Sequence, residues 1–414
     1  MSAAGRAETR RQPGRAAAAA WMGMLFDGLE TYLFILVAAP LIAALIQADS
    51  PRDPRVAPAG AVVQAVFLVG WGVGGVLFGR LGDRLGRARV MAWTILLYAV
   101  CAALTSVAQT YEQLVVLRFL TAVGVGGEWA AGGALVAETW PARSRVWLSP
   151  WLQTAYALGM VAASVVVAVW PISPRWVFLA GAVPAVLVFW IRLSVKEPRA
   201  WSEARVADPS RPGWGALFQP ELRKVTLFAL LISALAITNT WLIQFWIPQL
   251  LRGHSEVSSL PPEEISRFVG AATLIYIVAT IPGFFLAAWI GQRWGPKEAL
   301  TAMFLGGAVA VGITFGVEWS TTHLIVGLCF VCLFTGGVFG LFPVYLPSLF
   351  PVLLRTTGAG LCYNCGRFVA AAGTVMLSVV APVAQLRAAL LIGGLALCLC
   401  AVLAALRSGI ARGR

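Results

Sequence analysis

The chain has 414 residues, of which 59% are hydrophobic and 12% charged, and its mean hydropathy is +0.81. This composition excludes a soluble globular protein and indicates a polytopic membrane protein. The net charge of +13 does not predict nucleic-acid binding, because the basic residues are spread along the chain and are not gathered in one domain. We therefore expect a lipid bilayer, and no nucleic acid, as partner.

Twelve apolar runs are each long enough to cross a bilayer as a helix, which takes about 20 residues. They cover residues 20–46, 60–80, 90–108, 113–136, 147–170, 176–193, 223–250, 267–290, 298–317, 321–346, 356–382 and 386–406. The predicted fold class is therefore an all-α membrane protein with twelve transmembrane helices.

The longest polar stretch, residues 194–222, contains four prolines and divides six runs from six. Pro-rich polar segments of this kind are typical of linkers. We expect a six-helix bundle at 20–193, a cytoplasmic linker at 194–222 and a second six-helix bundle at 223–406. Basic tails at 1–19 and 407–414 are expected to flank them, the first disordered and without the apolar core of a signal peptide.

Lys and Arg are distributed very unevenly between the segments that join the runs. If the N-terminus is cytoplasmic, 23 of the 31 basic residues fall on cytoplasmic segments and six on exterior ones. The other two, Arg118 and Arg367, fall within apolar runs. The positive-inside rule then predicts that both termini and the linker are cytoplasmic.

A charged hairpin at 79–89, between the second and third runs, reads Gly-Arg-Leu-Gly-Asp-Arg-Leu-Gly-Arg-Ala-Arg. Its glycines suit a tight turn between helix ends, and Asp83 suits capping of the amides at a neighbouring helix N-terminus. The hairpin resembles the loop between helices two and three of the major facilitator superfamily of transporters, whose pattern is Gly-x-x-x-Asp-Arg-x-Gly-Arg. The matching residues are Gly79, Asp83, Arg84, Gly86 and Arg87.

The two halves of the chain match each other at an offset of 209 or 210 residues, which indicates a duplicated six-helix unit. The matched segments are Asp83-Arg84-x-Gly86 with Gln292-Arg293-x-Gly295, Gly126-Gly127 with Gly336-Gly337, and Glu138-x-x-Pro141-x-x-x-Arg145 with Ser348-x-x-Pro351-x-x-x-Arg355. The resemblance implies a gating network of acids and arginines at the cytoplasmic face. Because Gln292 and Ser348 replace the acids, we expect this network to be complete in the first half and weakened in the second.

Four further stretches narrow the resemblance to the metabolite:proton and aromatic acid:proton symporters and the sugar porters. Residues 26–30 look like the Asp-Gly-Tyr-Asp signature of the aromatic acid symporters, and 118–128 are similar to helix four of the metabolite symporters. Residues 196–201 resemble a shortened Pro-Glu-Ser-Pro-Arg motif, and 349–367 resemble the start of helix eleven. Helix five lacks the Gly-Pro-x-x-Gly-Gly motif of the drug:proton antiporters.

Five ionisable residues lie inside apolar runs, where each costs at least about 2.5–3.5 kcal/mol unless it has a partner or a function. They are Asp27, Glu30, Arg118, Glu128 and Arg367. Their charges sum to −1, so one bound proton would make the interior neutral, as proton-coupled transport needs. By resemblance to the sugar porters, Glu30 is the first candidate for the proton carrier, with Arg118 as partner and Asp27 and Glu128 as secondary candidates. The alternatives are packing contacts for the acids and a fixed Glu30–Arg118 salt bridge.

Arg367 stands about twelve residues into its run, near the membrane midplane, with Asn364 three residues earlier on the same face. A guanidinium at this depth presents a planar fork to a carboxylate, so we expect Arg367 to bind the substrate. The polar residues expected to line the same cavity are Asn364, Asn239, Gln244, Gln153 and Tyr156. Each of these has a helix-packing hydrogen bond as its alternative role.

Two cysteine pairs, Cys329-x-x-Cys332 and Cys362-x-x-Cys365, lie within apolar runs without a surrounding loop. We therefore read them as small hydrophobic residues, and we expect no metal and no cofactor. Both histidines, His254 and His323, fall in expected exterior loops, so we do not expect an enzyme.

The sequence thus favours a monomeric transporter of the bacterial inner membrane that takes up a small organic anion, a carboxylate or aromatic acid, together with protons. One alternative keeps the fold but transports a neutral sugar or polyol. Another is a sensor that binds a ligand without transporting it, against which the intact hairpin at 79–89 argues.

Overall fold

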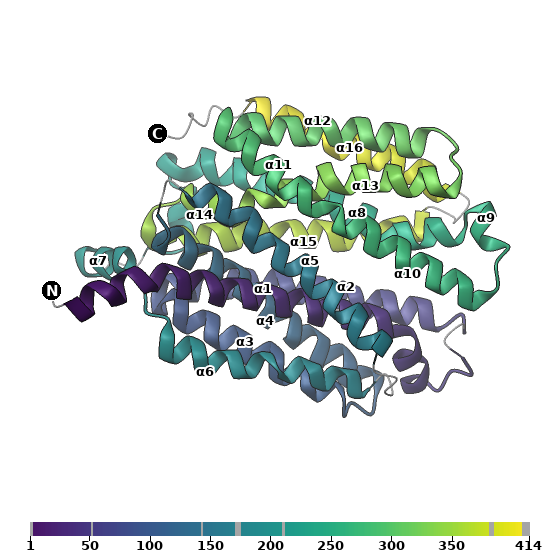
Figure 1. The fold of residues 1–414 in the computed structure, drawn as a ribbon, viewed down its shortest axis with the longest axis horizontal. Coiled ribbons are helices and arrows are strands. Elements are labelled where there is room, and N and C mark those ends of the chain that lie inside the picture. Colours follow the sequence, from purple (N-terminus) through teal and green to yellow (C-terminus); the bar gives the residue numbers. More distant parts are fainter. Residues whose placement is uncertain are drawn as a thin grey trace. The chain divides into compact units, whose positions relative to one another are not determined.

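The computed structural model describes residues 3–50, 53–141, 144–169, 175–208, 212–380 and 385–407. Every regular element in these residues is a helix (Figure 1). Ten of the described helices are long and apolar enough to cross a membrane. The prediction of an all-α membrane protein is confirmed.

The helices follow the order of the predicted apolar runs. Their bounds are α1 Ala3–Leu45, α2 Val56–Leu85, α3 Arg87–Thr105, α4 Tyr111–Thr139, α5 Arg145–Val169, η2 Trp176–Ala182, α6 Pro184–Ser194, α7 Arg199–Ala207, η3 Trp214–Phe218, α8 Pro220–Arg252, α9 Ser255–Ser258, α10 Pro262–Val278, α11 Thr280–Arg293, α12 Pro296–Gly316, α13 Thr321–Gly337, η4 Val338–Gly340, α14 Phe342–Ser348, η5 Val352–Leu354, α15 Arg355–Val380 and α16 Leu386–Arg407. The sixth, eighth and tenth runs are each divided into shorter helical pieces.

The N-terminal segment differs from expectation, because α1 already begins at Ala3. Residues 3–19, which we expected to be disordered, therefore extend the first helix. Alanine is the strongest helix former, and a run of it at 16–20 carries the helix past the apolar span. Ala16 and Ala19 are fully buried.

The described chain forms two compact units. Unit 1 contains residues 1–226 and 343–365, and unit 2 contains 227–342 and 366–414. In unit 1, α4 packs against α2 and α3, and α1 packs against α5. In unit 2, α12 packs against α13 and α16, and α13 packs against α11. The first part of α15, residues 355–365, therefore belongs to unit 1, whereas we expected all of 223–406 to form the second bundle.

Glycines allow α2 and α4 to approach each other closely. A Cβ at Gly126 would collide with the carbonyl oxygen of Trp71, and one at Gly74 would collide with the backbone of Val123. The hydrophobic effect does not drive helices together in lipid. Small residues at such positions allow close van der Waals contact, which holds the helices together instead.

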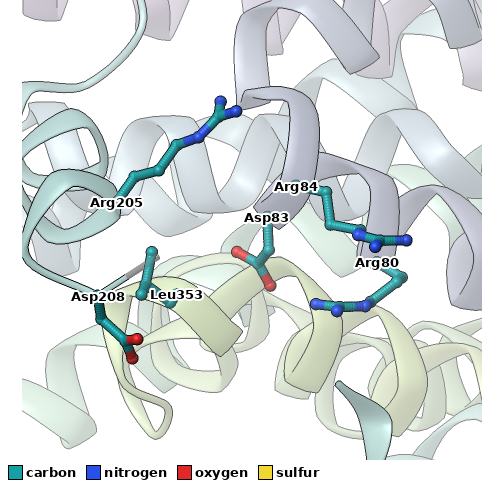
Figure 2. A pocket seen from close by; sticks show the side chains of 6 residues that line it. All are labelled: Arg80, Asp83, Arg84, Arg205, Asp208 and Leu353. Atoms are coloured by element: carbon teal, nitrogen blue, oxygen red, sulfur yellow. The ribbon is translucent and has the colours of Figure 1, made fainter. Parts of the chain in front are cut away.

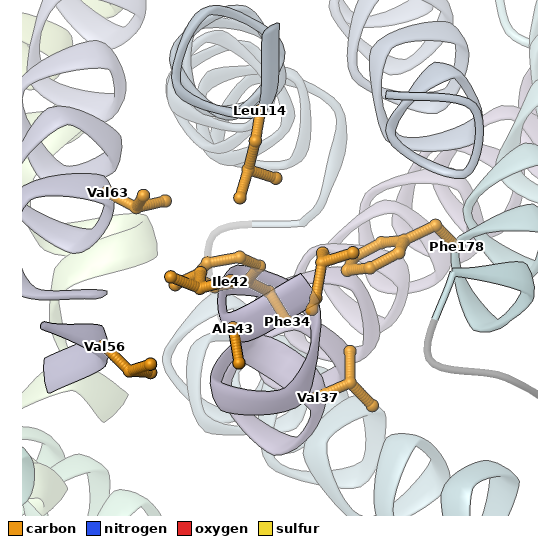
Figure 3. Packing of buried hydrophobic residues seen from close by; sticks show 9 residues of the cluster. Phe34, Val37, Ile42, Ala43, Val56, Val63, Leu114 and Phe178 are labelled. Carbon is orange, nitrogen blue, oxygen red and sulfur yellow. The ribbon is translucent and has the colours of Figure 1, made fainter. Parts of the chain in front are cut away.

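An apolar cluster packs between α1, α2, α4 and η2 of unit 1 (Figure 3). Phe34 and Ile42 of α1 meet Val63 of α2, Leu114 of α4 and Phe178 of η2. All five side chains are at most 2% exposed. The cluster therefore packs α1 against α2 and α4, the helices that carry the interior site described below.

The turns at Gly86 and Gly295 have nearly the same backbone conformation. Their φ angles are 114° and 116°, values that favour glycine. Among the described residues, these two glycines are the ones with positive φ. Gly86 joins α2 to α3, and Gly295 joins α11 to α12. The offset of 209 residues found in the sequence therefore relates two equivalent turns.

Candidate functional site

A buried charge network surrounds Arg87, the first residue of α3. Its Nη2 atom lies 2.9 Å from Asp83 Oδ1 and 2.9 Å from Glu138 Oε1. The same atom donates a 2.5 Å hydrogen bond to the carbonyl oxygen of Val352 in η5. The Arg87 side chain is fully buried, so a single guanidinium ties α2, α3, α4 and η5 together.

Asp83 caps the first turn of α15. Its carboxylate accepts hydrogen bonds from the amide of Thr357 at 2.7 Å, the hydroxyl of Thr357 at 2.6 Å and the amide of Thr356 at 3.4 Å. A negative charge is stabilised at this position because the free amides and the helix dipole are positive there. The sequence-based expectation that Asp83 caps a neighbouring helix is confirmed.

Glu197 caps α3 in the same way, from a position 110 residues away in the chain. It accepts hydrogen bonds from the amides of Arg87 at 2.7 Å, Ala88 at 3.3 Å and Arg89 at 3.0 Å. Trp201 of α7 donates its indole N–H to the carbonyl oxygen of Asp83 at 2.9 Å. The segment resembling Pro-Glu-Ser-Pro-Arg thus docks on the charged hairpin.

The remaining predicted gating residues have varied surroundings. A Cβ at Gly79 would lie 2.6 Å from the carbonyl oxygen of Thr356, so the glycine lets α2 approach α15. Arg355 lies 3.7 Å from Glu138, and Arg84 is exposed. The side chain of Arg145 lies outside the described residues.

Exposed and buried charges meet at a small hollow beside this network (Figure 2). It is lined by Arg80, Asp83, Arg84, Arg205, Asp208 and Leu353. The equivalent hairpin of unit 2 is different, because Gln292 and Arg293 are both exposed. Within the described ranges, no ion pair involves Arg293. The predicted asymmetry between the two halves is present in the geometry.

In the interior of unit 1, Glu30 of α1 and Arg118 of α4 form an ion pair in which both side chains are 1% exposed. The Arg118 guanidinium carbon lies 4.2 Å from the ring centre of Phe34 and 4.5 Å from that of Phe67. The aromatic faces stabilise the cation and exclude water from it. The pair predicted from the sequence therefore exists, inside an aromatic enclosure that was not predicted.

The other two predicted proton carriers are also in unit 1 and also buried. Asp27 is 2% exposed and Glu128 is fully buried. Four ionisable groups from α1 and α4 thus occupy one bundle interior.

The predicted substrate residues divide between the two units. Asn364, Gln153 and Tyr156 are in unit 1, whereas Arg367, Asn239 and Gln244 are in unit 2. Arg367 is 3% exposed and is the thirteenth of the 26 residues of α15. A rise of 1.5 Å per residue places it about 18 Å from the start of the helix.

Two of these polar side chains have hydrogen-bond partners within their own unit. Asn364 donates to the carbonyl oxygen of Gly360 at 2.9 Å, and Asn239 donates to the sulfur of Cys398 at 3.2 Å. Gln153 is buried, and Gln244 and Tyr156 are half-buried. Asn239 of α8 thus makes a helix-packing contact with α16, its alternative role, whereas Asn364 bonds within its own helix α15.

Several aromatic residues were missed by the sequence reading. Phe34 lies one helical turn after Glu30, so its position on the same face was available as a signal. Phe67, by contrast, comes from another helix. Trp129 and Tyr363 stack with ring centres 3.7 Å apart, a contact between segments more than 200 residues apart that no local pattern predicts.

Comparison with known proteins agrees with this architecture. The family model described as Major Facilitator Superfamily matches residues 20–374. The chain is 27% identical to the sialic acid transporter NanX of Escherichia coli, over 84% of this chain and 82% of that protein. It is 28% identical to the niacin transporter NiaP of Acinetobacter baylyi, over 86% and 84%. The structure of the proton:xylose symporter XylE superposes with a TM-score of 0.79 at 17% identity, over 96% and 95%.

Proposed function

Because the chain belongs to the major facilitator superfamily, we propose that it couples inward proton movement to uptake of a small organic anion by alternating access. As a multi-pass membrane transporter it is not an enzyme. The observation that carries the proposal is the buried Glu30–Arg118 ion pair. A carboxylate beside a cation gives up its proton readily, and it takes one up when that contact is lost. Movement of α1 against α4 would therefore bind and release a proton.

A carboxylate or aromatic acid is the proposed substrate. Two relatives are named as transporters of sialic acid and niacin, both of which are carboxylic acids. Arg367 supplies a buried guanidinium midway along α15. We propose that its fork binds the carboxylate through two parallel hydrogen bonds, while the polar groups of α8 orient the rest of the substrate.

The network around Asp83 and Arg87 is proposed to close the cytoplasmic side. Its contacts hold the start of α15 to α2 and α4 within unit 1. Alternating access requires these contacts to break when the cytoplasmic side opens, so they set the free energy of that opening.

We also propose that both termini are cytoplasmic and that the membrane is the bacterial inner membrane, since the transporters NanX and NiaP to which the chain is similar come from bacteria. Single cysteines at Ser202 and Ser258, both exposed, test the orientation. An impermeant thiol reagent added outside should label the second and leave the first unlabelled. If only the Ser202→Cys protein were labelled, the chain would have the opposite orientation in the membrane.

The decisive experiment is uptake into proteoliposomes under an imposed pH gradient, with a panel of carboxylates and polyols. We expect accumulation of a carboxylate. Arg367→Lys keeps the charge but loses the fork, so it should weaken carboxylate transport at least about tenfold, and Arg367→Gln should nearly abolish it. The matched control is Arg267→Gln, which changes an exposed arginine of the same unit and should behave like wild type.

The same preparation separates coupling from binding. Glu30→Gln should abolish accumulation driven by the pH gradient but retain exchange of substrate across the membrane. Unchanged accumulation in this variant would remove Glu30 from the coupling mechanism. Accumulation of polyols alone, unaffected by Arg367→Gln, would replace the organic anion with a neutral substrate. Binding without any uptake would indicate a sensor.

A further inference from the structure

In unit 2, His254 links the end of α8 to the start of α13. His254 is half-buried and directly precedes α9. Its Nε2 atom lies 3.0 Å from the carbonyl oxygen of Trp319, and its Nδ1 atom lies 3.1 Å from the hydroxyl oxygen of Thr321, the first residue of α13. The position of Trp319 is fixed independently, because its indole N–H donates to the carbonyl oxygen of Ile313 at 3.0 Å. The imidazole ring therefore bridges two segments of the chain.

The hydroxyl group of Thr321 has a second partner, the carboxyl group of Glu256. Thr321 Oγ1 lies 2.5 Å from Glu256 Oε2, and the backbone amide of Thr321 donates to the same oxygen at 3.1 Å. These two hydrogen bonds, together with the nearby His254, lower the pKa of the Glu256 carboxyl. Glu256 is therefore ionised and accepts hydrogen bonds without donating any, so the single hydroxyl proton of Thr321 is donated to it.

This arrangement decides which protons the His254 ring carries. A carbonyl oxygen accepts hydrogen bonds and cannot donate, so the contact with Trp319 needs a proton on Nε2. Because Thr321 donates its hydroxyl proton to Glu256, the contact between Nδ1 and Thr321 needs a proton on Nδ1 as well. A neutral imidazole carries a proton on one ring nitrogen, whereas an imidazolium carries one on each. The complete set of contacts therefore fits the imidazolium.

We propose that His254, Thr321 and Glu256 form a pH-controlled latch between the α8–α9 connection and the start of α13. When His254 is protonated, all the hydrogen bonds described above form together. When Nδ1 loses its proton to water, it becomes an acceptor, and the hydroxyl of Thr321 turns to it and leaves Glu256. Glu256 is exposed, so water replaces the lost donor and the α9 segment is held less firmly. A histidine changes its charge between about pH 5 and 8, so the latch responds in that range.

Other charged or titratable groups come from the segments around the latch. Those on α8, the α12–α13 connection, α13 and α16 are Arg252, Glu318, His323 and Arg387. Arg252 is exposed, and Glu318, which is 94% exposed, pairs with Arg387 at 3.3 Å. His323 is exposed, and its Nδ1 atom lies 2.7 Å from the hydroxyl oxygen of Ser320. A hydroxyl can donate or accept, so this contact forms with either protonation state of His323, which makes His323 a suitable control.

The side of the membrane on which the latch lies rests on the proposed function, whereas the exchange of hydrogen bonds does not. With both termini cytoplasmic, the α8–α9 and α12–α13 connections are exterior. His254 then responds to the pH outside, from which the coupled proton is taken. An acidic exterior closes the latch and holds the exterior ends of α8 and α13 together.

Spin labels on cysteines placed at Ser258 and Thr322 test the latch, because both positions are exposed and lie on the two linked segments. Electron paramagnetic resonance measures the distribution of distances between the labels in full-length protein that retains no other cysteine. We expect a narrow distribution at about pH 5.5 and a broader one at about pH 8.5. His254→Gln should abolish this dependence on pH, whereas the matched control His323→Gln should retain it.

A second measurement identifies the group that titrates. The chain has two histidines, so histidine labelled with a nitrogen isotope reports His254 alone in the nuclear magnetic resonance spectrum of the His323→Gln protein. The pH at which half of His254 is protonated should coincide with the pH at which half of the distance change has occurred. In Thr321→Val, which removes the hydroxyl but keeps the size, His254 should still titrate, and the distance distribution should no longer depend on pH.

A distance distribution that does not depend on pH in wild type would overturn the proposal. Persistence of the dependence in His254→Gln or in Thr321→Val would also overturn it. If either variant does not fold, the two midpoints decide alone, and midpoints that differ refute the latch. If the labelling of Ser258→Cys described above places this loop in the cytoplasm, the proposed orientation fails, and the distance measurements still decide whether the latch exists.

Discussion

Replacement of Asp83 by Asn tests whether a single carboxylate holds the start of α15 in place. The substitution keeps the size and one acceptor oxygen but removes the charge. It eliminates the 2.9 Å ion pair with Arg87, in which the two side chains are 0% and 1% exposed. The backbone amide and the hydroxyl of Thr357 both donate to the carboxylate of Asp83. The NH2 group of an asparagine side chain cannot accept these hydrogen bonds, so one side-chain oxygen remains as acceptor.

The size of the effect follows from burial. Removing one partner of a buried ion pair costs about 3–5 kcal/mol, because the other charge is left unpaired. Asn retains one acceptor, and Arg87 retains Glu138, so we take the lower end, about 3 kcal/mol. With tenfold for every 1.4 kcal/mol, the population in which α15 is undocked should rise roughly hundredfold.

The assay is the labelling rate of Cys362, a fully buried cysteine of α15, in a protein that retains no other cysteine. If labelling requires local opening, the rate follows the open population and should rise by about the same factor. Asp208→Asn is the matched control, because it removes an exposed acid from the same hollow (Figure 2). An unchanged rate in Asp83→Asn, or an equal rise in both variants, would refute the reasoning.

Three further predictions concern stability, each measured as a melting temperature in detergent. Glu197→Gln should cost about 1–2 kcal/mol, because three helix-terminal amides lose a charged acceptor; an unchanged melting temperature would contradict this capping role. The amide and hydroxyl of Thr321 donate to Glu256 and hold its pKa below the usual 4.5. The stabilisation is therefore fully present above pH 4.5 and lost as the pH falls below it. The melting temperatures of wild type and Glu256→Gln should therefore converge on acidification. A difference in melting temperature that does not change with pH would refute this linkage. Gly126→Ala should destabilise by about 1–3 kcal/mol through overpacking, whereas Gly270→Ala, where a Cβ meets no atom within 4 Å, should be neutral; equal effects would argue against the close α2–α4 contact.

The membrane helices could be predicted well because the signal is local. An apolar run of spanning length forms a helix wherever it lies, since the bilayer leaves its backbone no other hydrogen-bond partners. The role of Asp83 was also predictable, because a short acidic residue at a tight turn between helices faces helix N-termini. The resemblance to the sugar porters implied the Glu30–Arg118 pair, and the cost of leaving either charge alone in the membrane is consistent with it.

Contacts between distant segments could not be predicted in the same way. Glu197 caps α3 from a position 110 residues away, and nothing in its own neighbourhood identifies those amides as its partners. The aromatic enclosure of Arg118 needs Phe67, whose approach depends on how α2 packs against α4. The helix at 3–19 was missed because hydropathy identifies membrane spans but does not identify their polar extensions.

The internal duplication has kept its backbone but not its charges. Gly86 and Gly295 retain the same positive φ, since both turns need it whatever the side chains around them do. The charged partners have diverged: among the described residues, unit 1 buries the charged side chains of Asp27, Glu30, Asp83, Arg87, Arg118, Glu128 and Glu138, whereas unit 2 buries that of Arg367. A turn is a requirement of the fold, whereas a buried charge is costly and persists only where it is used. This division is what we expect if unit 1 handles protons and the cytoplasmic closure, and unit 2 contributes the cation that binds the anionic substrate.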